Sequence, residues 1–83
     1  MITIPGLRAS NVGQPIKLQI FERESENSET LLEESLKIYV GRLVGFFQDK
    51  DEVVLFLEER RPLSIKHKTH YLEVYAEPRT MTL

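Results

Sequence analysis

The side chains best suited to chemistry lie between Arg60 and His70. This segment holds four bases and both histidines of the chain and contains no acid. Positive side chains grouped in one place attract phosphate even when the chain as a whole carries a formal net charge of −2. Lys66, His67 and Lys68 stand together at an expected turn between two strands. The pattern predicts an anion-binding turn, and the alternative is a solvated turn without a ligand.

Phe46 and Phe47 are the second group of interest. Adjacent residues on a strand point to opposite faces, so one phenylalanine is expected in the core and the other outside it. An exposed aromatic ring can stack on a nucleic acid base, which contributes about 1–3 kcal/mol per base. Core packing is the more usual role for either residue taken alone.

The other groups of potentially reactive residues are not expected to form a metal site or a catalytic site. The acids between Asp49 and Glu52 lie on a predicted hairpin turn, where consecutive carboxylates diverge, so a solvated tip is expected and not a metal site. His67, His70 and Glu73 have metal-ligand spacing only on a helix, which the apolar pattern opposes. The chain has no cysteine and no nucleophile with a partner base in sequence. We therefore expect a protein that is not an enzyme and that needs no cofactor.

Consecutive strands are the elements that must position these residues. Short charged breaks separate runs rich in β-branched, aliphatic and aromatic residues, which is typical of antiparallel strands. Gly41 and Gly45 predict that the longest run is sharply bent, with the bend at Gly41 allowing closure. A bent strand followed by hairpins curls a small sheet into a barrel. The predicted strands are 16–20, 36–47, 53–57, 63–68 and 71–75.

Two segments do not follow the strand pattern. Residues 7–12 predict about one helical turn, because Gly13 ends it. Residues 22–35 allow two interpretations. A capping box of Thr30 and Glu33 favours a helix, whereas a return strand starting near Leu31 makes the segment a hairpin excursion. We favour the hairpin.

Length and composition limit the class of protein. The 83 residues are expected to form one domain over 1–83. A domain of this size buries too little apolar surface to be very stable alone, so association with other copies is expected. No apolar run reaches the ~18 residues of a membrane span, and the N-terminus lacks the features of a signal peptide. A cytoplasmic protein that does not enter membranes is the resulting expectation.

Three runs in order, which match two motifs, resemble the Sm/Lsm superfamily, and most of all its bacterial Hfq branch. The run from Gly41 to Phe46, followed by the apolar run 53–57, is similar to the first Sm motif. Ile65-Lys66-His67 is similar to the Lys-His signature of the second motif in Hfq, although Lys68 stands where alanine is usual. The resemblance covers roughly half the chain, and space remains for only about one turn of the family's N-terminal helix.

The resemblance implies a small, strongly bent, five-stranded antiparallel barrel of the SH3-like kind. It also implies a homo-oligomeric ring of about six or seven subunits, joined by pairing the fourth strand of one copy to the fifth strand of the next. The implied function is non-catalytic binding of single-stranded, uridine-rich RNA. Lys66 and His67 would contact phosphate and the uracil edge, Lys68 would add attraction, and Phe46 or Phe47 would stack a base.

A second function fits the same fold. The protein can be an Sm-fold assembly module that has lost RNA binding. The acidic residues of the 22–35 excursion and the short N-terminal helix favour this alternative, whereas the basic segment from Arg60 to His70 favours RNA.

Overall fold

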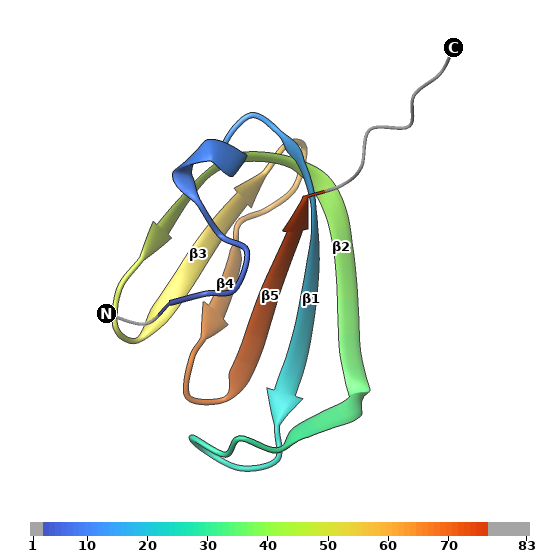
Figure 1. The fold of residues 1–83 in the computed structure, drawn as a ribbon, viewed down its shortest axis with the longest axis vertical. Helices are drawn as coiled ribbons and strands as arrows, with labels where there is room; N and C mark the ends of the chain where they lie inside the picture. The colour runs from blue at the N-terminus through green and yellow to red at the C-terminus, as the bar shows by residue number, and fades with distance from the viewer. Residues whose placement is uncertain (1–2, 77–83) are drawn as a thin grey trace.

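A computed structural model describes residues 3–76 and shows one five-stranded antiparallel sheet (Figure 1). The strands follow the order β4-β3-β2-β1-β5 across the sheet. Helix is limited, among the described residues, to one short 3-10 turn. The mainly β fold with five consecutive antiparallel strands is confirmed. The elements are η1 (Ala9–Asn11), β1 (Pro15–Arg23), β2 (Leu31–Gln48), β3 (Glu52–Leu57), β4 (Leu63–Lys66) and β5 (His70–Ala76).

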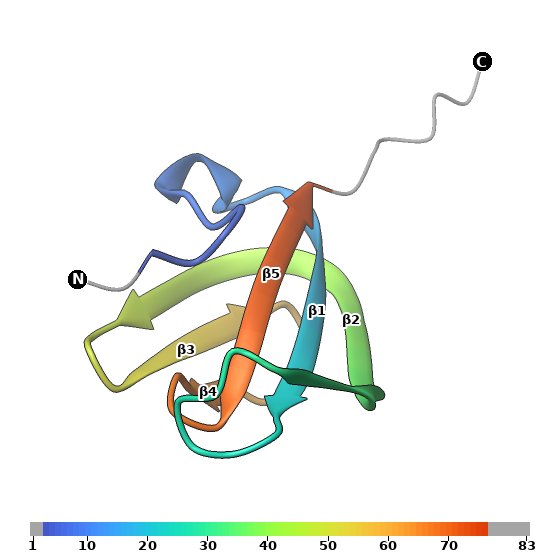
Figure 2. The same ribbon diagram turned by 60° about the horizontal axis from the view of Figure 1, so that its bottom comes forward.

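Strand β2 belongs to both halves of the sheet, and it curves around the other strands (Figure 2). Its first part pairs with β1, as far as Arg42 opposite Pro15, and its last part pairs with β3 from Leu43 onward. A β-bulge lies between Leu43 and Gly45. An extra residue in one strand reverses which side chains point inward and increases the local twist. The bulge therefore allows one strand to serve two partners.

The core lies between the β1–β2–β5 half and the β3–β4 half. Alternate residues of β1 are buried, as the predicted half-buried strand over 16–20 requires. No polar or charged side chain is buried among residues 3–76. Burial of apolar surface is thus the main stabilising term. The core side chains are Ile4, Ile16, Leu18, Ile20, Leu43, Val53, Leu55, Leu57, Ile65, Leu72 and Val74.

Gly41 lies next to the point where β2 changes partner, but the bend does not require its missing side chain. A β carbon at Gly41 would lie 3.8 Å from Leu57, which is an ordinary contact. Only Gly6 meets a severe obstacle. Its φ is +82°, and a β carbon there would lie 1.7 Å from the carbonyl oxygen of Val74. The sequence interpretation did not identify this requirement for glycine.

The segment around Gly6 covers part of one sheet edge. The backbone N–H of Val74 in β5 donates to the carbonyl of Pro5 at 2.9 Å. This bond is on the side of β5 that faces away from β1. The segment before β1 therefore blocks the β5 edge at Val74, near the C-terminal end of the strand.

The excursion between β1 and β2 is a hairpin, because β2 begins at Leu31. The hairpin interpretation is confirmed. Its tip does not project freely, since the Asn27 N–H donates to the carbonyl of Lys68 at 2.9 Å. No helix in the part of the chain that the structure describes is long and apolar enough to cross a membrane.

Candidate nucleic-acid-binding surface

Three connections lie together at one end of the sheet, two of them at the bottom of Figure 1 and the β2–β3 turn at its left. They are the β1–β2 tip (24–30), the β2–β3 turn (49–51) and the β4–β5 turn (67–69). The His67 N–H donates to the carbonyl of Asp51 at 3.0 Å, and the tip contacts the β4–β5 turn through Asn27 and Lys68. The basic turn predicted from the sequence is therefore placed beside the turn that follows Phe47.

Arg23, at the end of β1, holds two of these connections together. Its Nε donates to the carbonyl of His67 at 2.8 Å, and its Nη1 donates to the carbonyl of Ser28 at 2.9 Å. The guanidinium carbon lies 5.8 Å from the centroid of the Tyr71 ring. Charge-assisted hydrogen bonds of this kind are stronger than neutral ones. No local signal in the sequence indicates this role, because both acceptors are main-chain groups of distant turns.

Asp49 organises the β2–β3 turn. One carboxylate oxygen accepts the N–H groups of Asp51 at 2.8 Å and Glu52 at 2.9 Å. The hydrogen bond from Glu52, and then that from Asp51, hold the pKa of the Asp49 carboxyl below its ordinary value of 3.8. Within residues 3–76, no three histidine, cysteine, aspartate or glutamate side chains meet as a metal site would require.

The two lysines of the basic turn are at the surface. Lys66 is exposed, and no ion pair or hydrogen bond of its ammonium group is found in the described part of the chain. The Nζ of Lys68 lies 3.9 Å from Glu26, with both side chains more than half exposed. An exposed pair of this length is weak. Both ammonium groups are consequently available to a phosphate.

His67 is placed differently from the lysines. Its ring is half-buried, and its Nε2 is buried without a hydrogen-bond partner. The ring lines a cavity of about 70 Å³ together with Arg23, His70 and Tyr71. In this conformation the Nε2 atom does not face a ligand at the surface, so His67 contributes to the shape of the turn. The predicted contact between His67 and a base would require the ring to move.

Phe46 and Phe47 point to opposite sides of the sheet, as their adjacency predicts. Phe46 packs against the core, whereas Phe47 is 57% exposed. Phe47 is paired with Val54 of β3, and Val54 is paired with Ser64 of β4. Lys66 follows Ser64 by two residues and shares its face. Phe47 and Lys66 therefore lie on one exposed face, with their Cα atoms about 12 Å apart, because they are separated by two strand spacings across the sheet and two residues along it.

Acidic groups limit the positive potential of this face. Lys66 is paired in register with Glu52, whose carboxylate accepts the Ser64 hydroxyl at 2.6 Å. Asp49, Asp51 and Glu26 lie in the neighbouring connections. The surface therefore carries both positive and negative side chains. The lysines are accessible because of their positions on β4 and its turn, and not because of the net charge.

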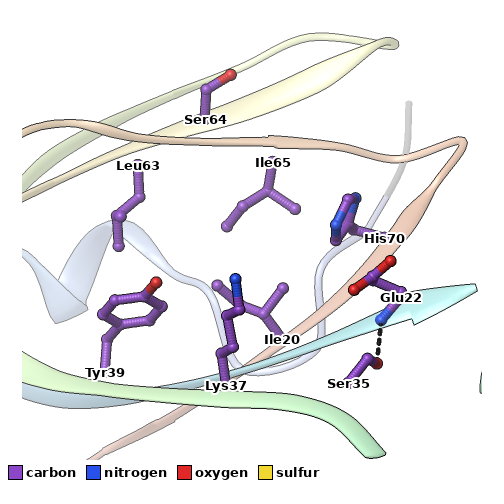
Figure 3. Close-up of a pocket in the computed structure, with 9 residues that line it drawn as sticks. All are labelled: Ile20, Glu22, Ser35, Lys37, Tyr39, Leu63, Ser64, Ile65 and His70. Carbon is purple, nitrogen blue, oxygen red and sulfur yellow. Dashed lines mark hydrogen bonds between the residues drawn. The ribbon is translucent and has the colours of Figure 1, made fainter. Parts of the chain in front are cut away.

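Another cavity lies elsewhere, between β4 and the inward side of β2 (Figure 3). Its volume is about 140 Å³. Lys37 extends from β2 toward Leu63 and Ile65, and the Glu22 N–H donates to the Ser35 hydroxyl at 2.7 Å (Figure 3). No hydrogen bond between a nucleophile and a base is found among its lining residues. The cavity offers polar groups but no arrangement for acyl or phosphoryl transfer.

Lys66, Lys68 and Phe47 are the predicted site residues that the structure leaves exposed together at this end, with Phe46 and His67 turned inward. Arg23 and Asp49 are the residues that sequence reasoning missed. Comparison with protein-family models, with curated proteins and with solved structures finds no match to this chain.

Proposed function

We propose that this protein binds single-stranded, uridine-rich RNA in the cytoplasm, without catalysis, as a homo-oligomeric ring with an Sm-like barrel in each subunit. One observation carries the proposal. Phe47 and Lys66 are exposed on the same face of β2 and β4, beside a turn that also presents Lys68. An aromatic ring beside two ammonium groups offers stacking for a base and attraction for its phosphates.

The role of each residue in RNA binding follows from the position of its side chain. Phe47 stacks on a base, since its ring is exposed on a rigid strand. Lys66 and Lys68 contact phosphate, and Arg23 and His67 keep the β4–β5 turn in position. A flexible single strand can bring its bases to such a platform, which double-stranded RNA cannot.

Assembly into a ring would repeat a weak RNA-binding site in every subunit. One subunit offers one Phe47 and a mixed charge, whereas a ring presents the same group several times to one RNA strand. The Sm/Lsm resemblance would pair the outer edge of β4 in one subunit with the outer edge of β5 in its neighbour. Because Pro5 already accepts from Val74, pairing at β5 would use the stretch from His70 to Leu72.

Fluorescence anisotropy with labelled oligo-uridine tests the proposal. Phe47→Ala should weaken binding about 5- to 150-fold, the equivalent of removing one stacked base. The matched control is Val44→Ala, because Val44 is also an exposed apolar residue of β2 but lies at the bulge, away from the β4–β5 turn. It should bind normally.

Lys66→Ala should weaken binding and also reduce its dependence on salt. Removing one phosphate contact lowers the slope of log affinity against log salt by about 0.7 for a single strand. Lys37→Ala, which removes a lysine on the cavity side of β2, is the control. Equal slopes for Lys66→Ala and the unmodified protein would contradict a phosphate contact at this residue.

The assembly module is the second candidate, and the exposed apolar row Leu36, Ile38 and Val40 on β2 favours it. This function predicts oligomers that do not bind RNA. If oligo-uridine fails to bind the unmodified protein even at about 50 mM salt, where phosphate contacts are strongest, assembly becomes the better description.

A further inference from the structure

The first half of β2 has a free hydrogen-bonding edge. From Lys37 to Arg42 the strand pairs with β1 on one side, and its ladder with β3 begins only at Leu43. Within residues 3–76 no strand pairs with the other side of this stretch. An edge of this kind presents unpaired N–H and C=O groups to any strand that fits it.

The direction of each main-chain group follows from the residues at the end of the stretch. Leu43 donates to Gln14 and accepts from Gly13, so its main chain faces β1. The carbonyl of Arg42 accepts from Glu58, on the opposite side. Main-chain groups alternate along an antiparallel strand. Ile38 and Val40 consequently turn both N–H and C=O toward the free edge.

The side chains along this edge form an apolar row. Leu36, Ile38 and Val40 are 39%, 52% and 48% exposed and point to the outer face. Natural edge strands usually carry charges, prolines or bulges that prevent pairing. Residues 37–41 contain no proline and no bulge, and their one charged side chain, Lys37, points to the cavity on the inner side. The row is therefore suited to contact another apolar strand.

We propose that two copies of the protein join by antiparallel pairing of this edge, with the two-fold axis at Ile38. This register sets Ile38 against itself and Leu36 against Val40, so the apolar rows meet. Lys37 then lies opposite Tyr39 of the second copy, whose ring already has the Arg60 guanidinium of its own chain 5.5 Å from its centroid. The free N–H and C=O groups of Ile38 and Val40 find partners in the same register.

The neighbouring registers fit less well. Moving the axis to Lys37 would place two ammonium groups directly opposite each other, which is destabilising. Moving it to Tyr39 would set Leu36 against Arg42, whose carbonyl is already bonded to Glu58. The axis at Ile38 avoids both conflicts.

Charge also favours a second copy as the occupant, in the antiparallel direction. Glu33 and Glu34 precede the apolar row and Arg42 follows it. Antiparallel pairing brings Glu34 of one copy toward Arg42 of the other, whereas parallel pairing would set each of these residues beside its own like charge. The Arg42–Glu58 pair, at 3.5 Å with side chains 61% and 52% exposed, is weak enough to exchange.

This interface does not rest on the proposed RNA function. It uses neither Phe47 and Lys66 nor the edges of β4 and β5. Whatever number of copies those other edges join, the β2 edge doubles it. Breaking the β2 edge should therefore halve the mass of the particle and leave its RNA affinity per subunit unchanged.

Paired charge substitutions at Ile38 test the two-fold axis. Ile38→Lys and Ile38→Glu should each halve the mass seen by sedimentation velocity, because like charges meet at the axis. An equimolar mixture of the two variants should recover the full mass, because the introduced lysine of one variant meets the introduced glutamate of the other when Ile38→Lys pairs with Ile38→Glu, and this recovery also shows that both variants are folded. Val44→Lys, at an equally exposed position of β2 beyond the edge, is the control and should keep the full mass.

Three results would overturn the interface. The first is an unmodified protein that shows no such doubling at any concentration from micromolar to millimolar. The second is an Ile38→Lys variant with the mass of the unmodified protein. The third is a mixture of Ile38→Lys and Ile38→Glu that stays at half mass, which would place a different partner or a different axis at this edge.

Discussion

Two edges of the same sheet are treated in opposite ways. The outer edge of β5 is covered at Val74, where Pro5 accepts a hydrogen bond and Gly6 lies against the carbonyl. The free edge of β2 between Leu36 and Gly41 has no such cover among residues 3–76 and carries exposed apolar side chains. The chain thus blocks pairing at the Val74 part of the β5 edge with its own N-terminal segment and leaves the β2 edge available.

The difference also separates rigid from adaptable regions. The end with three connections is fixed by Arg23, Asp49 and the main-chain bond from His67 to Asp51. Such bonds order a loop before any ligand arrives, which lowers the entropy cost of binding. No strand pairs with the β2 edge among the described residues, and the interaction found there is the Arg60 guanidinium 5.5 Å from the centroid of the Tyr39 ring. We expect mutations in the fixed regions to change stability, and mutations at the β2 edge to change assembly.

Gly6→Ala should have the largest effect on stability. A β carbon would collide with the Val74 carbonyl, and the positive φ of Gly6 disfavours any side chain. We expect a decrease of about 2–4 kcal/mol in the free energy of unfolding, the sum of a backbone term and an overpacking term. Urea denaturation measures it.

Gly13→Ala is the matched control, because φ is +88° but nothing lies within 4 Å of the added carbon. Only the backbone term remains, about 1 kcal/mol. Equal decreases for the two variants would show that Gly6 is not in close contact with Val74.

Arg23→Met should have an intermediate effect. Methionine keeps much of the apolar stem but removes the bonds to the carbonyls of His67 and Ser28. The expected decrease in the free energy of unfolding is about 1–3 kcal/mol, together with faster amide exchange at Asn27 and His67. Arg42→Met removes only an exposed ion pair and should cost less than about 1 kcal/mol. Unchanged amide exchange in Arg23→Met would show that Arg23 does not hold the two connections together.

The pH dependence of Asp49 should be the smallest effect. Its folded pKa is lowered, first by the Glu52 N–H and then by the Asp51 N–H. A carboxyl of this kind stabilises the fold above its unfolded pKa, and that contribution disappears as pH falls through the folded pKa. Below the ordinary value of 3.8, the unmodified protein should lose more stability than Asp49→Asn, which keeps the acceptor oxygen but not the charge. Parallel decreases in acid would contradict this role.

The sequence predicts the parts of the fold that depend on local pattern. Alternation in 16–20 and the apolar runs around Leu43, Val53, Leu63 and Leu72 suffice to place five strands. The choice between helix and hairpin after Glu22 could be made only loosely, because the capping box of Thr30 and Glu33 is equally local. In the structure the hairpin prevails through contacts to a distant turn.

What the sequence did not reveal depends on contacts between distant residues. Gly6 is required by Val74, and Arg23 binds carbonyls that any residue type would supply. The bulge after Leu43 decides that Phe47 and not Phe46 is exposed, and nothing in the apolar pattern marks it. The buried Nε2 of His67 likewise depends on distant residues, because the ring lines a cavity with Ile4, Arg23 and Tyr71.

RNA binding by the unmodified protein is tested most directly by native mass spectrometry with oligo-uridine at two ionic strengths. We predict that the oligomer gains the mass of the RNA at about 50 mM salt and loses it at several times that concentration, since phosphate contacts release counterions. An oligomer whose mass is unchanged by oligo-uridine at the lower salt would contradict RNA binding.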